Sequence, residues 1–319
     1  MADPFLRLGT YCIQYPIQMN TLSIYLKLSL LLAVSFLFGC TQKNEETAGS
    51  STSKIIIALE PDKDPDAMLE DRAALESYLA ASTDRSVEAI VPISSAVIYE
   101  GLRNGTIDLA YLSATAAGKL IEKDIIDILL AELIDGKPYY QSYWITLKDA
   151  PYQTISDLKG QPVAFSSRTS TSGFLIPVWD LYTQGLINLE NGPKGFFGED
   201  NVFYGVGYVS AAERVLRGEA QAAAVSYYVL DKDKHLHQEQ RNRLRMLDSQ
   251  GPVPSHVVVA RKGLKNQDQT ALREALLRMN TDEIALRDRI FGAQLAPANA
   301  ETHLHTTLEA LKISRSMQF

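Results

Sequence analysis

Four consecutive residues of this chain, Ser170, Thr171, Ser172 and Gly173, have the composition of an anion-binding site. An apolar segment ending at Phe165 precedes them and an apolar helical pattern follows, so we expect them at a helix start. The first N–H groups of a helix have no intrahelical partner, and the helix dipole makes that end positive. Hydroxyl groups add neutral donors, and glycine lets the backbone approach a ligand closely. This run therefore predicts a site for a small oxyanion.

Two features of the run have more than one interpretation. Arg168 is a candidate for a charged fork on the anion, or for a side chain that faces solvent. The three hydroxyl residues also fit an ordinary helix N-cap after a polar loop. From the residues alone, the anion site and the simple cap remain alternatives.

The elements around the run alternate between short apolar strands and helices, which predicts an α/β fold. Residues 55–59 form a continuous apolar segment, typical of a parallel strand buried on both faces. Further strands are expected at 87–91, 107–112, 162–165, 201–206, 222–225, 244–247 and 257–260. Two longer apolar segments, 125–133 and 139–147, are expected to carry the chain between two lobes.

Helix boundaries are predicted from caps and glycines. Asp64-Pro65 opens a helix whose expected inner face is Met68, Leu69, Leu75 and Leu79. A helix over 94–104 ends at Gly105, Ser113 caps the next helix, and another covers 170–182. Ser210 and Glu213 match a capping box with serine at the cap, and two or three helices are expected after residue 260.

The N-terminus has the pattern of an export signal. Residues 28–38 are apolar, Lys27 precedes them, and the run is too short to span a bilayer. Leu37-Phe38-Gly39-Cys40 resembles the lipobox of bacterial lipoproteins, which implies cleavage before Cys40 and acylation of its thiol. We expect a signal peptide over 1–39, with Met19 as a candidate start, and a lipidated tether over 40–53. A plain signal peptide or a buried strand remains an alternative.

Composition excludes several classes of function. The 319 residues are 46% hydrophobic and 22% charged, which fits a folded protein large enough for two lobes. A net charge of −7 disfavours a nucleic-acid partner. The five histidines, at positions 235, 237, 256, 303 and 305, lack metal-site spacing. No nucleophile with an adjacent base is recognisable, so we expect neither an enzyme nor a cofactor.

Several motifs together resemble the phosphate, phosphite and phosphonate substrate-binding proteins of ABC transporters. The most specific is Ser-Thr-Ser-Gly-x-Leu-x-Pro at residues 170–177. Weaker matches share a position next to a predicted strand or turn and lie at 105–111, 158–160, 218–220, 252–254 and 257–261. The resemblance covers nearly all of residues 54–290.

The resemblance implies a type II periplasmic-binding fold in which the ligand lies between two lobes. Lobe 1 would comprise 54–146 and 247–319, and lobe 2 would comprise 147–246. Ser170, Thr171 and Ser172 would hold the oxyanion, and Tyr111 would line the cleft unless it is a core aromatic residue. The resemblance also implies ABC permease and ATPase subunits as partners, a monomer, and a location at the cell envelope, anchored by lipid and facing the periplasm or the exterior.

Three departures from the family pattern leave the ligand open. The family often has Tyr where Ser95 stands, His-Asp where Tyr208-Val209 stand, and Asp where Ser226 stands. Their absence argues against an aminoalkyl ligand, while Ser95, Tyr208, Ser226 and Tyr227 remain candidate hydrogen-bond donors. The departures also motivate an alternative function as a sensory subunit that signals to a membrane kinase.

Overall fold

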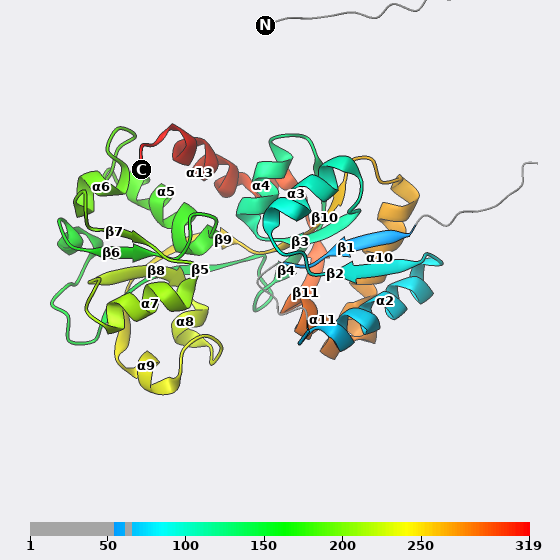
Figure 1. Cartoon of the computed structure of the whole chain (residues 1–319), viewed down its shortest axis with the longest axis horizontal. Coiled ribbons are helices and arrows are strands. Elements are labelled where there is room, and N and C mark those ends of the chain that lie inside the picture. Colours follow the sequence, from blue (N-terminus) through cyan, green and yellow to red (C-terminus); the bar gives the residue numbers. More distant parts are fainter. Residues whose placement is uncertain (1–53, 61–65) are drawn as a thin grey trace, which may run out of the picture. The chain divides into compact units, whose positions relative to one another are not determined.

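The computed structural model describes residues 54–60 and 66–319. The predicted signal peptide, Cys40, the tether and the helix start at Asp64-Pro65 lie outside these residues. Within the described part, two mixed β-sheets are covered by helices, which confirms the predicted α/β class (Figure 1). No helix in this part is long and apolar enough to cross a membrane.

The first sheet has the strand order β11-β4-β10-β3-β1-β2 in the described residues. Its strands are β1 (Ile55–Ala58), β2 (Val87–Ile90), β3 (Leu109–Leu112), β4 (Ile126–Leu133), β10 (Val257–Arg261) and β11 (Gln294–Pro297). β1 pairs in parallel with β2 and β3, whereas β10 is antiparallel to both β3 and β4. The carboxyl ends of β1 and β3 therefore meet at one edge, where ligands of such sheets usually bind.

Helices cover both faces of the first sheet (Figure 1). They are α2 (Leu69–Thr83), α3 (Ser95–Asn104), α4 (Ala114–Ile121), α10 (Asn266–Asp282), α11 (Ile284–Phe291) and α12 (Ala300–His303). One apolar cluster joins the sheet to α2, α10 and α11, and a second joins it to α3 and α4. The predicted end of α3 at Gly105 and the cap of α4 by Ser113 are confirmed.

The second sheet has the order β7-β6-β8-β5-β9 in the described residues. Its strands are β5 (Tyr139–Leu147), β6 (Val163–Phe165), β7 (Val202–Tyr204), β8 (Ala222–Ser226) and β9 (Leu244–Pro254). Its helices are η1 (Ile155–Leu158), η2 (Thr171–Leu175), α5 (Ile176–Thr183), α6 (Gly192–Phe197), α7 (Tyr208–Leu216), α8 (Tyr228–Asp231) and α9 (Gln238–Asn242). α5 and α6 share one apolar cluster with the sheet and α7 belongs to another, on the opposite face (Figure 1).

The chain passes between the sheets at two places. β4 belongs to the first sheet and β5 to the second, so one crossing lies at residues 134–138. β9 and β10 are likewise in different sheets, and Ser255 lies at that crossing. The Ser255 amide donates to the Pro138 carbonyl at 3.1 Å and its hydroxyl donates to the Glu132 carbonyl at 2.6 Å, which joins the two crossings.

The C-terminal part differs from the expectation. Four helices and the strand β11 follow β10, where two or three helices were predicted. The last helix, α13 (His305–Ser316), begins beside α4, but Ile313, Met317 and Phe319 pack into the core of the second sheet. The predicted lobe limits assigned the end of the chain to the first sheet, but its apolar residues pack against the second. Three apolar residues near the terminus need a core to cover them.

Ser210 was predicted to cap a helix, and this prediction is wrong. α7 begins two residues earlier at Tyr208, with Gly207 as its N-cap. The Ser210 hydroxyl accepts from the Val206 and Gly207 amides at 3.1 and 3.3 Å, so it satisfies the same kind of unpaired donor from inside the first turn. This shift places Tyr208 at the start of the helix.

The predicted inner face of α2 is right for three residues and wrong for Leu69. Leu75 and Leu79 are fully buried and Met68 is nearly so, whereas Leu69 is 63% exposed. We expect Leu75→Ala to lower the free energy of unfolding by about 2–5 kcal/mol, because it removes buried methyl groups and leaves a cavity. Leu69→Ala, the matched control, should change it by less than about 0.5 kcal/mol. Urea unfolding of both variants tests this, and equal losses would contradict the placement of α2.

Candidate functional site

The hydroxyl turn, defined as residues 170–173, opens the helix that follows β6. Ser170 is its N-cap, and the Ser170 hydroxyl accepts from the Gly173 amide at 2.9 Å. The first turn is the π-helix η2, which continues directly into α5. The predicted helix start is therefore confirmed, with the unpaired N–H groups and positive dipole end that such a start provides.

Ser172 contacts three side chains outside the turn. It is fully buried, and its hydroxyl lies 3.2 Å from the Tyr140 hydroxyl, which donates to it, and 2.9 Å from the Tyr208 hydroxyl. The Ser142 hydroxyl donates to the Ser172 carbonyl at 2.6 Å. Tyr208 also lies 3.4 Å from the Ser170 hydroxyl. Hydroxyls from β5 and the start of α7 thus converge on one residue of η2.

Thr171 faces a different element. Its hydroxyl accepts from the Thr115 amide at 3.1 Å and lies 2.9 Å from the Thr115 hydroxyl. Thr115 belongs to α4 on the first sheet, so the hydroxyl turn joins the two sheets. The sequence pattern predicted that Thr171 holds the ligand but gave no sign of this partner.

Gly173 is required for packing, a reason that the sequence pattern did not indicate. A Cβ atom at this position would lie 2.5 Å from both Cβ and Oγ of Ser166. The Ser166 amide also donates to the Gly173 carbonyl at 3.0 Å, which ties the turn to the end of β6. Close approach of two protein segments therefore suffices to explain the glycine.

Arg168 stacks on aromatic rings. The centre of its guanidinium lies 4.1 Å from the Tyr204 ring centroid and 5.3 Å from that of Phe319. Such contacts between a cation and an aromatic face are attractive, so they give the side chain a structural role. A charged fork on the ligand stays a prediction for this residue.

No hydrogen bond among the described residues joins the candidates on the first sheet, Tyr111 and Ser95, to the hydroxyl turn. Tyr111 is buried in a core cluster, and its hydroxyl lies 2.8 Å from the Phe291 carbonyl and 3.2 Å from Glu132 Oε2. Burial first, and then Glu132, raise the pKa of the Tyr111 phenol. Ser95 is the exposed first residue of α3, and no hydrogen bond among the described residues joins it to another candidate.

Ser226 and Tyr227 lie at the end of β8, near the hydroxyl turn. Ser226 pairs in register with Ser142, so both side chains lie on the face toward η2. The Ser226 hydroxyl is fully buried and has no hydrogen-bond partner among the described residues. The Tyr227 ring lies 4.3 Å from Tyr228 and 5.9 Å from Tyr140, centroid to centroid. β8 thus supplies a buried donor and an aromatic group beside the turn.

Several residues near the turn were not predicted from the sequence, because they lie outside the recognisable motifs. Each of them contacts a residue that is distant in sequence, and they are Thr115, Tyr140, Ser142 and Tyr228. A pair of tyrosines at 139–140 opening an apolar strand was the one available signal. Tyr140 and Tyr228 stack with ring centroids 6.0 Å apart, which places a second aromatic ring beside the site.

An acidic cluster with one histidine lies where the chain crosses between the sheets. His256 Nε2 is 3.3 Å from Glu60 Oε2, and His256 Nδ1 is 3.6 Å from Glu132 Oε2. Burial by itself would lower the pKa of the imidazole, but Glu60 and Glu132 outweigh it and raise that pKa well above its usual 6.5. His256 is therefore a cation held between two carboxylates at neutral pH.

This cluster predicts a pH dependence of stability. A histidine whose pKa is raised by folding stabilises the protein fully below the unfolded pKa, about 6.5, and loses that contribution as pH rises through the folded value. We expect the free energy of unfolding to decline as pH rises above about 6.5, and His256→Gln to lack this decline. Urea unfolding across this range measures it. Parallel curves for the two proteins would refute the assignment.

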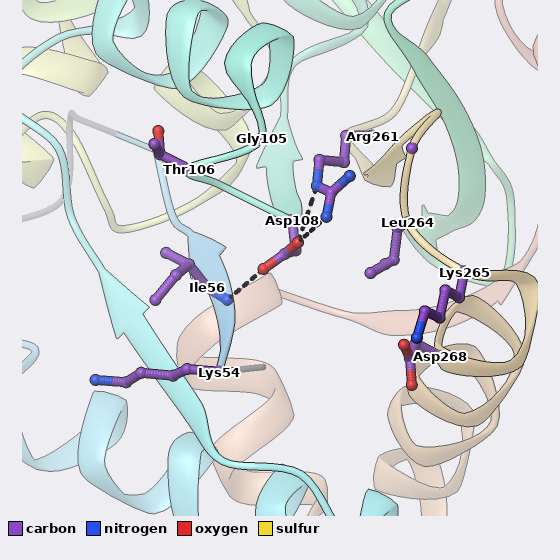
Figure 2. Close-up of a pocket in the computed structure, with 10 residues that line it drawn as sticks. Lys54, Ile56, Gly105, Thr106, Asp108, Arg261, Leu264, Lys265 and Asp268 are labelled. Atoms are coloured by element: carbon purple, nitrogen blue, oxygen red, sulfur yellow. Dashed lines mark hydrogen bonds and ion pairs between the residues drawn. The ribbon is translucent and has the colours of Figure 1, made fainter. Parts of the chain in front are cut away.

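A separate pocket of about 210 Å³ lies at the opposite edge of the first sheet. Its lining includes Lys54 and Ile56 at the start of β1, Asp108 before β3, and Arg261 at the end of β10 (Figure 2). Asp108 accepts from the Ile56 amide and pairs with Arg261 at 2.9 Å, so its charge is already compensated. None of the predicted site residues lines this pocket.

Comparison with known proteins places the chain in a family. Residues 57–302 match the family described as the ABC transporter, phosphonate, periplasmic substrate-binding protein. The phosphate-import protein PhnD of Mycolicibacterium smegmatis is 27% identical over 207 residues, which are 63% of this chain and 64% of that protein. The chain thus spans less than two thirds of that relative's length.

Solved structures show the same fold at low identity. XAC2383 from Xanthomonas citri, bound to ATP, has a TM-score of 0.71 and 20% identity, and the match covers 83% of this chain and all of that one. PhnD1 from Prochlorococcus marinus (MIT 9301), in complex with methylphosphonate, has a TM-score of 0.67 and 16% identity, with coverage of 83% and 100%. The predicted type II periplasmic-binding fold is confirmed. The matched family consists of transporter substrate-binding proteins and not of enzymes, and this chain belongs to it.

Proposed function

We propose that this chain is the extracytoplasmic solute-binding protein of an ABC importer and captures a small oxyanion at the hydroxyl turn. The anion would be of the phosphate, phosphite or phosphonate class, in keeping with the names of its relatives. The observation that carries the proposal is the convergence of the Tyr140 and Tyr208 hydroxyls on Ser172, at a helix start. These hydroxyls can rotate their protons toward an anion oxygen.

Neutral donors suit this chain better than cations. The net charge is −7, so a long-range positive field does not gather anions, and recognition depends on short-range hydrogen bonds. Hydrogen bonds to a charged acceptor are roughly twice as strong as neutral ones, and they gain further strength away from water. A tetrahedral oxyanion offers acceptors in several directions, which fits hydroxyls that arrive from three elements.

The alternative is a sensory subunit that passes ligand binding to a membrane kinase. Tyr208 and Ser226 motivate it, since they stand where relatives of the resembled family carry a His-Asp pair and an Asp. Tyr208 contacts both Ser170 and Ser172, so the substituted position lies directly at the proposed site. Copurification with permease and ATPase subunits supports import, and copurification with a kinase instead supports sensing.

Ser172 provides the direct test of ligand binding. Loss of a hydrogen bond to a charged group costs about 1.5–3 kcal/mol, so Ser172→Ala should raise the Kd about 10- to 100-fold. The matched control is Ser167→Ala, because among the described residues the Ser167 side chain bonds only to Thr169. Isothermal titration calorimetry with inorganic phosphate, phosphite, methylphosphonate and sulfate measures the Kd. Equal affinities of the Ser172 variant and the wild type would remove Ser172 from the site.

We also propose that the protein is a monomer anchored through acylated Cys40. Stable anchoring requires more than one acyl chain, which lipoproteins of the resembled type carry. In a bacterial host, the wild-type chain should sediment with membranes, and Cys40→Ala should abolish acylation and release it. Mass spectrometry of the mature N-terminus reads the modification directly. An unmodified N-terminus at another residue would contradict this assignment.

A further inference from the structure

The contact between Thr115 and Thr171 links the two sheets at the proposed site. Both residues are almost fully buried, with 2% and 3% of their surfaces exposed. The Thr115 amide donates to the Thr171 hydroxyl at 3.1 Å, and the two hydroxyl oxygens are 2.9 Å apart. Thr115 lies in the first turn of α4, and Thr171 is the first residue of η2. Two helix starts from different sheets therefore meet here.

The first turn of α4 is completed by a residue of the other sheet. Its cap Ser113 accepts from the Ala116 amide through its hydroxyl and from the Ala117 amide through its carbonyl. The Thr115 amide instead finds its acceptor in Thr171. Buried amides need a partner, so this contact satisfies a donor that α4 cannot satisfy itself.

The hydrogen-bonding capacity of Thr171 determines which of the two hydroxyls donates in this contact. A threonine hydroxyl accepts two hydrogen bonds and donates one. The Thr115 amide fills one acceptor position, and the bond between the two hydroxyls can run either way. If Thr115 donates, both acceptor positions of Thr171 are filled and its own proton is released for a third partner.

We propose that Thr115 is a positioning residue that makes oxyanion binding and the contact between the sheets a single event. This inference rests on the proposed function. A deprotonated oxygen of the anion only accepts, so Thr171 must donate to it, and the bond to Thr115 must then run from Thr115 to Thr171. Each bond strengthens the other, because donors in a chain polarise one another. An anion also offsets the repulsion between two positive helix ends that face each other.

The organisation of the cores makes such coupling effective. The helices α2, α3, α4, α10 and α11 pack with the first sheet and α5, α6 and α7 with the second, in separate apolar clusters, whereas α13 packs with both. The chain connects the sheets at two crossings and through α13, and the buried contact between Thr115 and Thr171 adds a direct hydrogen bond between them. Thr115 and Thr171 are separated by 56 residues of sequence, so this bond forms only when the two sheets are assembled together.

The test compares three variants in calorimetric titrations with inorganic phosphate, phosphite and methylphosphonate. Thr115→Val removes the hydroxyl but keeps the amide and the shape, and we expect about fivefold weaker binding, the worth of one hydrogen bond. Thr115→Ser restores the hydroxyl and should bind within about twofold of the wild type. Thr146→Val is the matched control, since Thr146 is a fully buried threonine that donates to the Gln221 carbonyl away from the site. It should leave the affinity unchanged.

A double-mutant cycle separates coupling from general destabilisation. In a Thr171→Val background, Thr115→Val should cause no further loss of affinity, because the relay has already been removed. Unchanged affinity in Thr115→Val, or the same loss in both backgrounds, would overturn the inference while leaving the proposed function intact. If the wild type binds none of these anions, both the proposed function and this inference fail.

Discussion

The position of the first turn after β6 is the constraint on which the site depends. Two hydrogen bonds from the second sheet and one within the turn hold it: Ser142 donates to the Ser172 carbonyl, the Ser166 amide donates to the Gly173 carbonyl, and the Ser170 hydroxyl accepts from the Gly173 amide. The absent side chain of Gly173 allows the close approach to Ser166. Because these contacts fix the backbone of the turn, the Ser172 hydroxyl and the positive end of the helix dipole are held at the same helix start. A site built this way needs little reorganisation to bind.

Electrostatics divide the described residues around the turn into two regions. Around Ser172 the polar groups are neutral hydroxyls, with Arg168 held against aromatic rings. Around the crossings between the sheets, His256 lies between Glu60 and Glu132, so charge is concentrated there and largely compensated. The Tyr111 hydroxyl lies within hydrogen-bonding distance of Glu132 on β4 and of the Phe291 carbonyl at the end of α11. In the proposed function, an anion would meet hydroxyl donors at the turn and carboxylates at the crossings, which favours binding at the turn.

Features set by neighbouring residues were predictable from the sequence. Gly105 ends α3, Ser113 caps α4 and Ser170 caps the hydroxyl turn, because caps depend on residues three or four positions away. Periodicity located the strands for a similar reason. Periodicity failed for Leu69, the first residue of α2, and the capping-box pattern failed for Ser210, whose hydroxyl accepts from amides before it instead of after it.

Contacts between distant residues were not predictable. Tyr140 reaches Ser172 across 32 residues and Thr115 reaches Thr171 across 56, and neither pair has a local pattern. His256 was set aside because its sequence neighbours contain no metal-ligand spacing, yet folding brings Glu60 and Glu132 to it. The sequence therefore predicted the fold class and the turn itself, while the surroundings of the turn required the assembled sheets.

A crystal structure of the mature protein grown with methylphosphonate tests the central claim most directly. The account predicts a phosphonate oxygen within hydrogen-bonding distance of the Ser172 hydroxyl and of backbone amides in the hydroxyl turn. It also predicts the Thr115–Thr171 contact in the same complex. A phosphonate bound elsewhere, such as in the pocket lined by Lys54 and Arg261, with the hydroxyl turn making no contact to it, would contradict the account.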